Sequence, residues 1–242
     1  MYNELILHQK SSTTKRWIPI GRLKFESGYY IFCYTKGIKS FKGFKPFEKM
    51  NDLNKVYRSK ELFPIFQNRL LQKSRPEYKN YMDWLDIKGN ALNPMVELAL
   101  TGGLRATDSL ELIPMPHEQD GYYRVKFFSH GIRHVAPSCL QRIESLNKEE
   151  KLYILKDIQN IYDCDALALR TTEPSELVGY CPSSYLKDFN KLIKYNGSSM
   201  VEVKVVKTNK TAPSQLKLLC EFTTKWYDGF VPFSDDEYQP IA

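Results

Sequence analysis

Short strand-like segments dominate the sequence from residue 109 onward, and they constrain the fold more than any other feature. A sheet built from strands this short must protect its edges, and closing the sheet on itself does so. We therefore expect a small closed or half-closed β-barrel that ends in a hairpin within residues 199–226. The segments are rich in β-branched and aromatic residues and are separated by turn residues; they span 110–115, 121–130, 151–157, 166–170 and 177–181.

Helical patterns interrupt this barrel at 136–146 and 182–195. Three shorter helices are predicted before it, at 59–72, 75–87 and 93–103, and the last of them has an Asn93 cap, Pro94 in its first turn and two glycines at its end. Residues 16–34 predict a hairpin, and the following stretch from Lys36 to Lys55 predicts a loop. The fold class is therefore α+β, with a β-rich and helical part at 1–108 and the barrel at 109–242.

The charge is concentrated at the N-terminus. Residues 1–84 hold 17 basic and 7 acidic side chains, a net +10, in a chain whose total is +7. Such a region attracts a phosphate backbone by releasing counterions, but it also suits an acidic protein partner or a soluble surface. The sequence has neither a secretion signal nor a run of about 18 apolar residues, so we expect a cytoplasmic protein without a membrane partner.

Metal binding and catalysis find little support in the motifs. His130 and His134 have the spacing of two ligands on one helix face, but Gly131 and the adjoining strand pattern argue against a helix there. The sequence has no HExxH, CxxC, GxSxG or phosphate-loop motif. We therefore predict a protein that is not an enzyme and that holds no metal ion and no cofactor.

Two short motifs stand close together in the second half of the chain: "NIYDCDA" begins at Asn160, and "GYCP" begins at Gly179. The first matches an N-x-Y-D-x-x-A turn and the second a G-Y-x-P strand end, and both patterns are those of the HIRAN domain, which residues 122–200 resemble. The matching residues are Asn160, Tyr162, Asp163, Ala166, Gly179, Tyr180 and Pro182. The resemblance implies a modified OB-like barrel, found alone in bacteria and attached to helicases and nucleases, that captures a free 3′ end of single-stranded DNA.

The resemblance also implies DNA-binding residues. Arg133 and His134 fall where the family has a basic and aromatic pair, Tyr162 and Asp163 on the turn that contacts the terminal nucleotide, and Tyr180 beside the pocket. An aromatic ring stacks on a base for about 1–3 kcal/mol, and arginine forks onto a phosphate. A carboxylate such as Asp163 accepts a hydrogen bond from a terminal 3′ hydroxyl, which an internal nucleotide lacks.

Three positions depart from the family's pattern. Ile161 stands where a proline is common, Asp165 where an asparagine is common, and His134 where the family has a tyrosine. The extra carboxylate weakens anion capture, and the imidazole stacks less strongly. An alternative interpretation is that "NIYD" is a tight turn in which Asn160 and Asp163 bond their own backbone and Tyr162 packs in the core.

A second likeness concerns residues 15–72, which resemble the first β-rich subdomain of HipA-type toxin kinases. It implies a front that docks on a separate kinase toxin or another protein subunit, in a defence or toxin–antitoxin setting. The leading hypothesis is a non-catalytic protein that binds a single-stranded DNA end. The competing one is an antitoxin-like partner of a HipA-type kinase with a vestigial DNA pocket.

Overall fold

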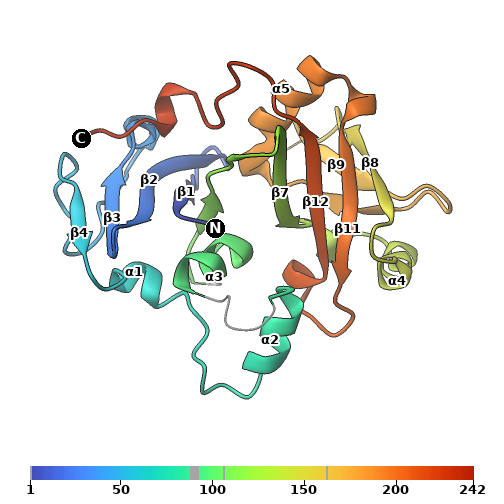
Figure 1. Ribbon diagram of the computed structural model, residues 1–242, viewed down its shortest axis with the longest axis horizontal. Coiled ribbons are helices and arrows are strands. Elements are labelled where there is room, and N and C mark those ends of the chain that lie inside the picture. Colours follow the sequence, from blue (N-terminus) through green and yellow to red (C-terminus); the bar gives the residue numbers. More distant parts are fainter. Residues whose placement is uncertain (1, 88–92, 106, 162) are drawn as a thin grey trace. The chain divides into compact units, whose positions relative to one another are not determined.

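The computed structural model describes residues 2–87, 93–105, 107–161 and 163–242. It has the predicted α+β fold class, with two curled sheets and few helices (Figure 1). The chain forms two compact units. The first consists of Met1–Arg75, Gly89–Met115 and Phe233–Ala242, and the second of Pro76–Lys88 and Pro116–Pro232. The domains 1–108 and 109–242, drawn from sequence patterns, stay a prediction.

The first unit is built on a five-stranded antiparallel sheet in the order β4-β3-β2-β1-β5. The predicted hairpin is confirmed as β2 and β3, and its turn uses Ser27 and Gly28 at positive φ. The strand predicted at 110–115 was assigned to the wrong sheet, because β5 pairs with β1 in this unit. The strands are β1 (Glu4–Lys10), β2 (Trp17–Glu26), β3 (Tyr29–Tyr34), β4 (Tyr57–Ser59) and β5 (Leu110–Pro114).

The α-helices α1 (Pro64–Gln67) and α3 (Pro94–Thr101) accompany this sheet. α3 confirms the predicted third helix: Asn93 Oδ1 accepts a hydrogen bond from Val96 N at 3.0 Å, and Gly102 ends the helix at φ 68°. The helix predicted over 59–72 was too long, because only α1 forms. The buried Arg69 explains why α1 ends early. Its guanidinium donates to the Gly103 carbonyl and to the Asp108 carboxylate, and these long-range bonds fix the chain after Gln67 in a conformation other than a helix.

The C-terminal residues pack on this same unit. Ile241 N donates to the Tyr34 carbonyl at 3.0 Å, and Lys36 Nζ lies 2.7 Å from Asp236. The rings of Phe233 and Tyr238 meet the ring of His8 edge-on, at 6.4 and 5.8 Å between centroids. His8 is fully buried on β1, and this burial lowers its pKa to about 3.

The second unit holds a seven-stranded sheet in the order β10-β9-β8-β11-β12-β7-β6, and β7, β12 and β11 run side by side in Figure 1. Just after β7, the backbone of His130 pairs with that of Tyr180 in β10. Each amide nitrogen donates to the carbonyl of the other residue at 2.9 Å. The sheet therefore curls until strands from opposite sides meet, as predicted for a half-closed barrel. The strands are β6 (Glu118–Gln119), β7 (Tyr122–Phe128), β8 (Lys151–Lys156), β9 (Leu167–Arg170), β10 (Leu177–Tyr180), β11 (Glu202–Thr208) and β12 (Leu218–Lys225).

Both helices predicted within the barrel sequence form, as α4 (Pro137–Ser145) and α5 (Leu186–Asn196), and α2 (Tyr78–Trp84) also belongs to this unit. α5 has one strongly apolar side, and its Phe189 stacks on Phe222 of β12 with centroids 3.9 Å apart. Tyr185 stacks on the same Phe189 at 5.4 Å. This aromatic stack anchors α5 to the sheet.

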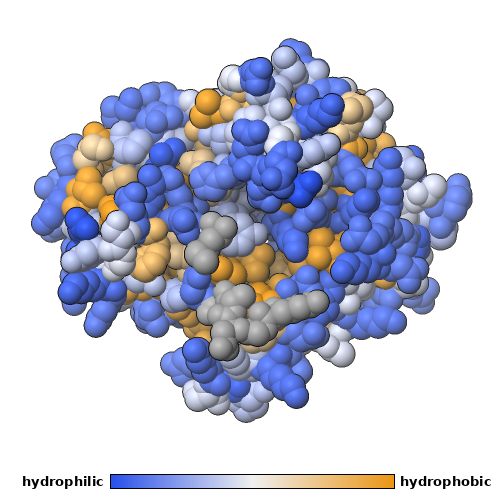
Figure 2. Space-filling view, viewed as in Figure 1, coloured by the Kyte–Doolittle hydropathy of each residue, from blue (hydrophilic) through white to orange (hydrophobic). Residues whose placement is uncertain are grey.

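Polar residues dominate the face seen in Figure 2, with apolar residues in scattered groups between them. Among the described residues, no helix combines the length and apolar character needed to cross a membrane. Within the described ranges, Ile158 and Ile161 are the most exposed large apolar side chains, at 79% and 87%, and both lie on the loop between β8 and β9.

Candidate nucleic-acid interface

The loop after β7 carries Arg133 and His134. Gly131 turns the chain at φ 75°, and a short 3-10 helix, η2 (Ile132–His134), follows. Ile132 is buried and anchors this helix, whereas Arg133 and His134 are exposed. Arg133 Nε donates a hydrogen bond to His134 Nε2 at 2.9 Å. This bond sets the guanidinium beside the imidazole, and both are accessible to solvent.

Tyr180, at the end of β10, lies against this loop. A side-chain carbon built at Gly131 would approach Cδ2 of the Tyr180 ring to 3.2 Å, so the ring packs over the glycine. The Tyr180 hydroxyl donates to Asp157 Oδ2 at 3.0 Å. Burial, and then the hydrogen bond and charge of Asp157, raise the pKa of Tyr180 above its ordinary value. The hydroxyl therefore remains a donor throughout the neutral range.

The loop from Asp157 to Ala166 is tied to itself by hydrogen bonds. Asp157 N donates to the Ala166 carbonyl at 2.9 Å, and Ala166 N donates to the Asp163 carbonyl at 3.1 Å. Asn160 Oδ1 accepts from Asp163 N at 3.1 Å, and Asp163 Oδ1 accepts from Asp165 N at 3.0 Å. These are the turn bonds of the alternative interpretation, and they hold the Asp163 carboxylate in one orientation.

Asp157 connects this turn to β10. Its Oδ2 accepts from Tyr180 and also from Asn160 Nδ2, which lies 3.3 Å away. A continuous chain of contacts thus runs from Gly131 through Tyr180, Asp157 and Asn160 to Asp163. The structure joins the loop of Arg133 and His134 to the turn of Asp163 in this way. Tyr162, the remaining predicted site residue, lies outside the described residues.

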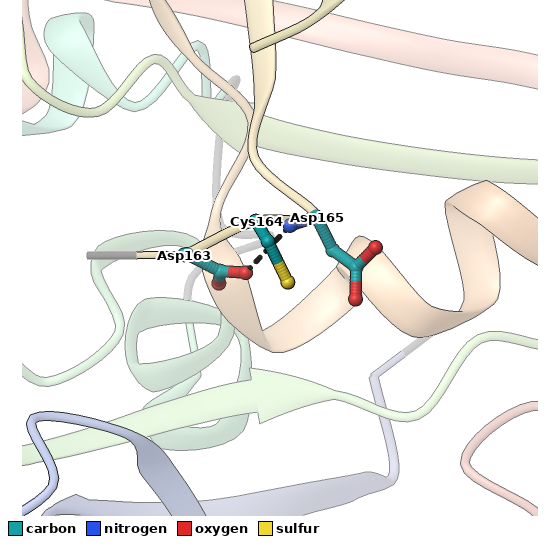
Figure 3. A group of neighbouring side chains, drawn as sticks. All are labelled: Asp163, Cys164 and Asp165. Atoms are coloured by element: carbon teal, nitrogen blue, oxygen red, sulfur yellow. Dashed lines mark hydrogen bonds between the residues drawn. The ribbon is translucent and has the colours of Figure 1, made fainter. Parts of the chain in front are cut away.

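Three neighbouring side chains of the turn, Asp163, Cys164 and Asp165, lie together in Figure 3, where the dashed line marks the bond from Asp165 N to Asp163. Their ligand atoms lie within 4.8 Å of one another. Asp165 Oδ1 also lies 3.2 Å from Lys156 Nζ. The existing bonds make this group part of the framework of the turn, and exposed acidic groups of this kind are common without an ion.

The electrostatic character of the site is divided. Arg133 provides a positive charge at the first loop, whereas Asp157, Asp163 and Asp165 provide negative charge at the turn, offset in part by Lys156. A phosphate is attracted to the Arg133 side and repelled by the carboxylates. The turn side suits a neutral hydrogen-bond donor, such as a hydroxyl group.

The sequence analysis missed two features of the turn. One is Asp157, which links the turn to Tyr180, and the other is the exposure of Ile158 and Ile161. Gly179 was matched to a motif, but the structure supplies the reason for that glycine. A side-chain carbon at Gly179 would lie 2.1 Å from Ser129 Oγ and 2.6 Å from the His130 carbonyl, and φ is +118°. A glycine inside a strand is a known sign of close backbone approach, so this signal was available in "LVGYC".

Comparison with known proteins identifies the second unit. A family model described as HIRAN domain matches residues 122–227. This chain therefore contains a HIRAN domain in that range, as the motifs predicted, and such a domain indicates DNA binding. No curated protein matches the chain. The comparisons give no support to the HipA-type likeness of residues 15–72, which stays a prediction.

Two crystal structures are similar to part of the chain. One is a protein from Lactobacillus plantarum, with 15% identity, a TM-score of 0.34, and coverage of 43% of this chain and 97% of that one. The other is the HIRAN domain of human HLTF, with 14% identity, a TM-score of 0.32, and coverage of 44% and 81%. Both likenesses are too distant to transfer the role of any residue to this chain.

Proposed function

We propose that the HIRAN domain of this protein binds the free 3′ end of single-stranded DNA at the two joined loops. The contacts of Tyr180 support this most directly: its ring packs on Gly131 and its hydroxyl bonds Asp157. Because one side chain touches the first loop and the turn, a nucleotide beside it can meet Arg133 on one side and Asp163 on the other.

The first loop holds the phosphate and the base in this proposal. Only Nε of Arg133 bonds His134, and among the described residues its two terminal nitrogens have no protein partner. They are therefore available to fork onto a phosphate. The exposed imidazole of His134 offers a face on which a base can stack. The stacking role of Tyr162 remains a prediction from the resemblance.

The turn recognises the end itself. Asp163 uses Oδ1 to accept from Asp165 N, and we assign its other oxygen to the terminal 3′ hydroxyl. A carboxylate accepts from a hydroxyl but repels a phosphate, so this position favours an unmodified end over a phosphorylated or internal one. Ile158 and Ile161 add apolar surface against which the sugar or base packs. We assign no catalytic step to the site.

The test compares oligonucleotides that differ only at the 3′ end. We expect a 3′-hydroxyl strand to bind at least about tenfold more tightly than a 3′-phosphate strand, since a hydrogen bond to a charged group contributes about 1.5–3 kcal/mol. The measurement is fluorescence anisotropy at low salt. Equal affinity for the two strands would contradict recognition of the 3′ end. Failure to bind either strand would contradict the proposed function as a whole.

Asp163→Asn separates the proposed role from the role in the turn. The amide oxygen still accepts from Asp165 N, so the turn is kept, but the negative charge is gone. We expect the variant to retain its thermal stability and to lose its preference for the 3′-hydroxyl end. An unfolded variant is uninformative about the ligand, so Asp163→Glu serves as a second variant, which keeps the charge and should retain part of the preference.

The biological setting we propose is bacterial defence or a toxin–antitoxin system. The alternative for residues 1–108 is docking on a HipA-type kinase or another protein subunit, in which case DNA binding is secondary. Affinity purification from the native host in high salt separates the two. A protein that remains bound after DNA has been washed away favours the alternative.

A further inference from the structure

The loop between β3 and β4 has a three-residue repeat. Between residues 38 and 50 the apolar side chains Ile38, Phe41, Phe44, Phe47 and Met50 recur at this spacing, and all five are buried or half-buried. Phe41 N donates to the Ile38 carbonyl at 3.0 Å, and Phe44 N donates to the Phe41 carbonyl at 3.1 Å. Turns thus close at 38–41, 41–44 and 47–50, whereas Phe47 N bonds the Tyr34 hydroxyl instead, and an apolar side chain returns to the core at every third residue.

Aromatic contacts fix these anchors to the core of the first unit. The Phe44 and Phe47 rings lie 5.7 and 5.9 Å from the ring of Tyr34, which is fully buried on β3. The Tyr34 hydroxyl accepts from Phe47 N at 2.8 Å and donates to the Met50 carbonyl at 2.7 Å. The loop is therefore pinned along its length, although it contains no strand longer than an isolated bridge.

A lysine follows each of the first three anchors. Lys39, Lys42 and Lys45 are exposed, and we call these three residues the lysine row. Among the residues that the structure describes, none of the three forms an ion pair, whereas Lys36, Lys204, Lys207 and Lys217 all do. Lys39 lies in the 3-10 helix η1 (Lys36–Ser40), Lys42 lies in the turn that Phe44 N closes, and Lys45 follows that turn. Like charges this close along a pinned loop repel one another, and an anion lowers that repulsion.

The chemistry of the row favours a polyphosphate partner over a protein. A protein interface has apolar and aromatic anchors at its centre, but here the phenylalanines are committed to the core of the unit. What remains at the surface between residues 39 and 45 is charge of one sign, followed by the exposed Glu48 and Lys49. The three lysines match the repeated charge of a nucleic-acid backbone. The HIRAN domain in the same chain already indicates DNA as a ligand.

We propose that the lysine row is a second nucleic-acid site, one that holds the phosphate backbone of single-stranded DNA without regard to sequence or to ends. It goes beyond the proposed function because it lies in the first unit and needs no terminal nucleotide. The row needs only a phosphate backbone, whereas the HIRAN site needs a terminal nucleotide.

A closed single-stranded circle tests the row apart from the end site, because a circle has no 3′ hydroxyl. We expect the wild-type protein to bind the circle with strong salt dependence. Changing Lys39, Lys42 and Lys45 together to glutamine should weaken this binding about tenfold at low salt. The slope of log affinity against log salt should fall by about 2, since each neutralised phosphate of a single strand contributes roughly 0.7.

Two matched triple variants complete the experiment. Arginine at the same three positions keeps the charge and should keep the affinity for the circle. Glutamine at Lys60, Lys148 and Lys210, which are exposed but scattered along the chain, removes the same net charge and should lower the affinity much less. An equal loss in this control, an unchanged salt slope in the row variant, or preferential binding of poly-glutamate by the row overturns the proposal.

The two proposals fail separately. A protein that binds the circle but does not distinguish 3′-hydroxyl from 3′-phosphate strands retains the row and loses end recognition. A protein that distinguishes the ends but binds no circle retains the HIRAN site and loses the row.

Discussion

The lysine row and the turn at 157–166 are both exposed loops, but they present charge in opposite ways. The row has charges of one sign without carboxylate partners among the described residues, on a backbone pinned by phenylalanines. The turn has charges of both signs, and hydrogen bonds from Tyr180, Asn160 and Lys156 orient its carboxylates. The first arrangement suits binding by charge alone, and the second suits recognition by geometry.

The largest expected effect concerns the closure of the barrel that carries the turn. Gly179→Ala would force a carbon to 2.1 Å from Ser129 Oγ at a backbone φ of +118°. Overpacking and backbone strain each cost about 1–3 kcal/mol, so we expect a loss of roughly 3 kcal/mol or more in the free energy of unfolding. Urea denaturation followed by circular dichroism measures it.

Gly121→Ala is the matched control for this change. Gly121 lies in the same unit at φ +80°, with nothing within 4 Å of an added carbon. It carries the backbone strain without the clash, so we expect a loss of only about 1 kcal/mol. If both substitutions destabilise the protein equally, close approach at the barrel closure is not the reason for Gly179.

The next largest effect is a loss of stability of the first unit at acidic pH, caused by the buried His8. Burial lowers the pKa of His8 to about 3, whereas an unfolded histidine titrates near 6.5. Between these values the unfolded state binds a proton that the folded state does not, so stability is present above pH 6.5 and falls as the pH decreases. At pH 5 we expect a loss of about 2 kcal/mol relative to pH 7, from 1.36 kcal/mol per pH unit.

The check is hydrogen exchange of the first unit at pH 5 and pH 7, corrected for intrinsic rates. His8→Phe keeps a ring against Phe233 and Tyr238 and removes the titrating group. The variant should show a weaker acid loss in the first unit. An unchanged pH dependence means that other groups cause it.

A smaller effect is expected at the link between the two loops of the HIRAN site. Tyr180→Phe keeps the ring on Gly131 and removes the hydroxyl that bonds Asp157. A hydrogen bond to a carboxylate contributes about 1.5–3 kcal/mol, and because this one holds the two loops together and does not contact the strand, only part of it affects binding. Affinity for a 3′-hydroxyl strand should therefore fall several-fold. Binding of the closed circle should not change. A parallel loss for both ligands would contradict a role of Tyr180 in the end site alone.

The smallest effect sharpens the contrast between geometry and charge. Arg133→Lys keeps the charge but loses the planar fork, so binding of the strand end should weaken about threefold, a few tenths to one kcal/mol. The equivalent exchange in the lysine row, lysine to arginine, should have no such effect. If Arg133→Lys binds as the wild type does, the first loop also works by charge alone.

Local sequence patterns predicted much of the fold. Alternation of apolar residues predicted the hairpin of β2 and β3 and the strands β7 to β10, and cap residues predicted α3. These patterns failed where contacts between residues distant in the sequence determine strand pairing or the end of a helix. β5 pairs with β1, about a hundred residues earlier, and α1 ends early because Arg69 bonds Gly103 and Asp108. β1 itself was missed.

The candidate site was predicted in part. The HIRAN resemblance selected Arg133, His134, Asp163 and Tyr180, and their binding of DNA stays a prediction. The structure places Tyr180 at the end of β10, where it contacts the loop of Arg133 and, through Asp157, the turn of Asp163. The sequence motif could not select Asp157, because the role of that carboxylate depends on its bond from the Tyr180 hydroxyl, which comes 23 residues later. Nor could net charge distinguish lysines that form ion pairs from those that do not.

By itself, the sequence determined the class of fold, most of the strands and the HIRAN motif, because these depend on the order and spacing of neighbouring residues. Only the tertiary structure decided which sheet each strand joins, which histidine is buried and which charges lack partners among the described residues. The physical reason is that burial and pairing are properties of contacts between distant parts of the chain, and a local pattern does not contain them.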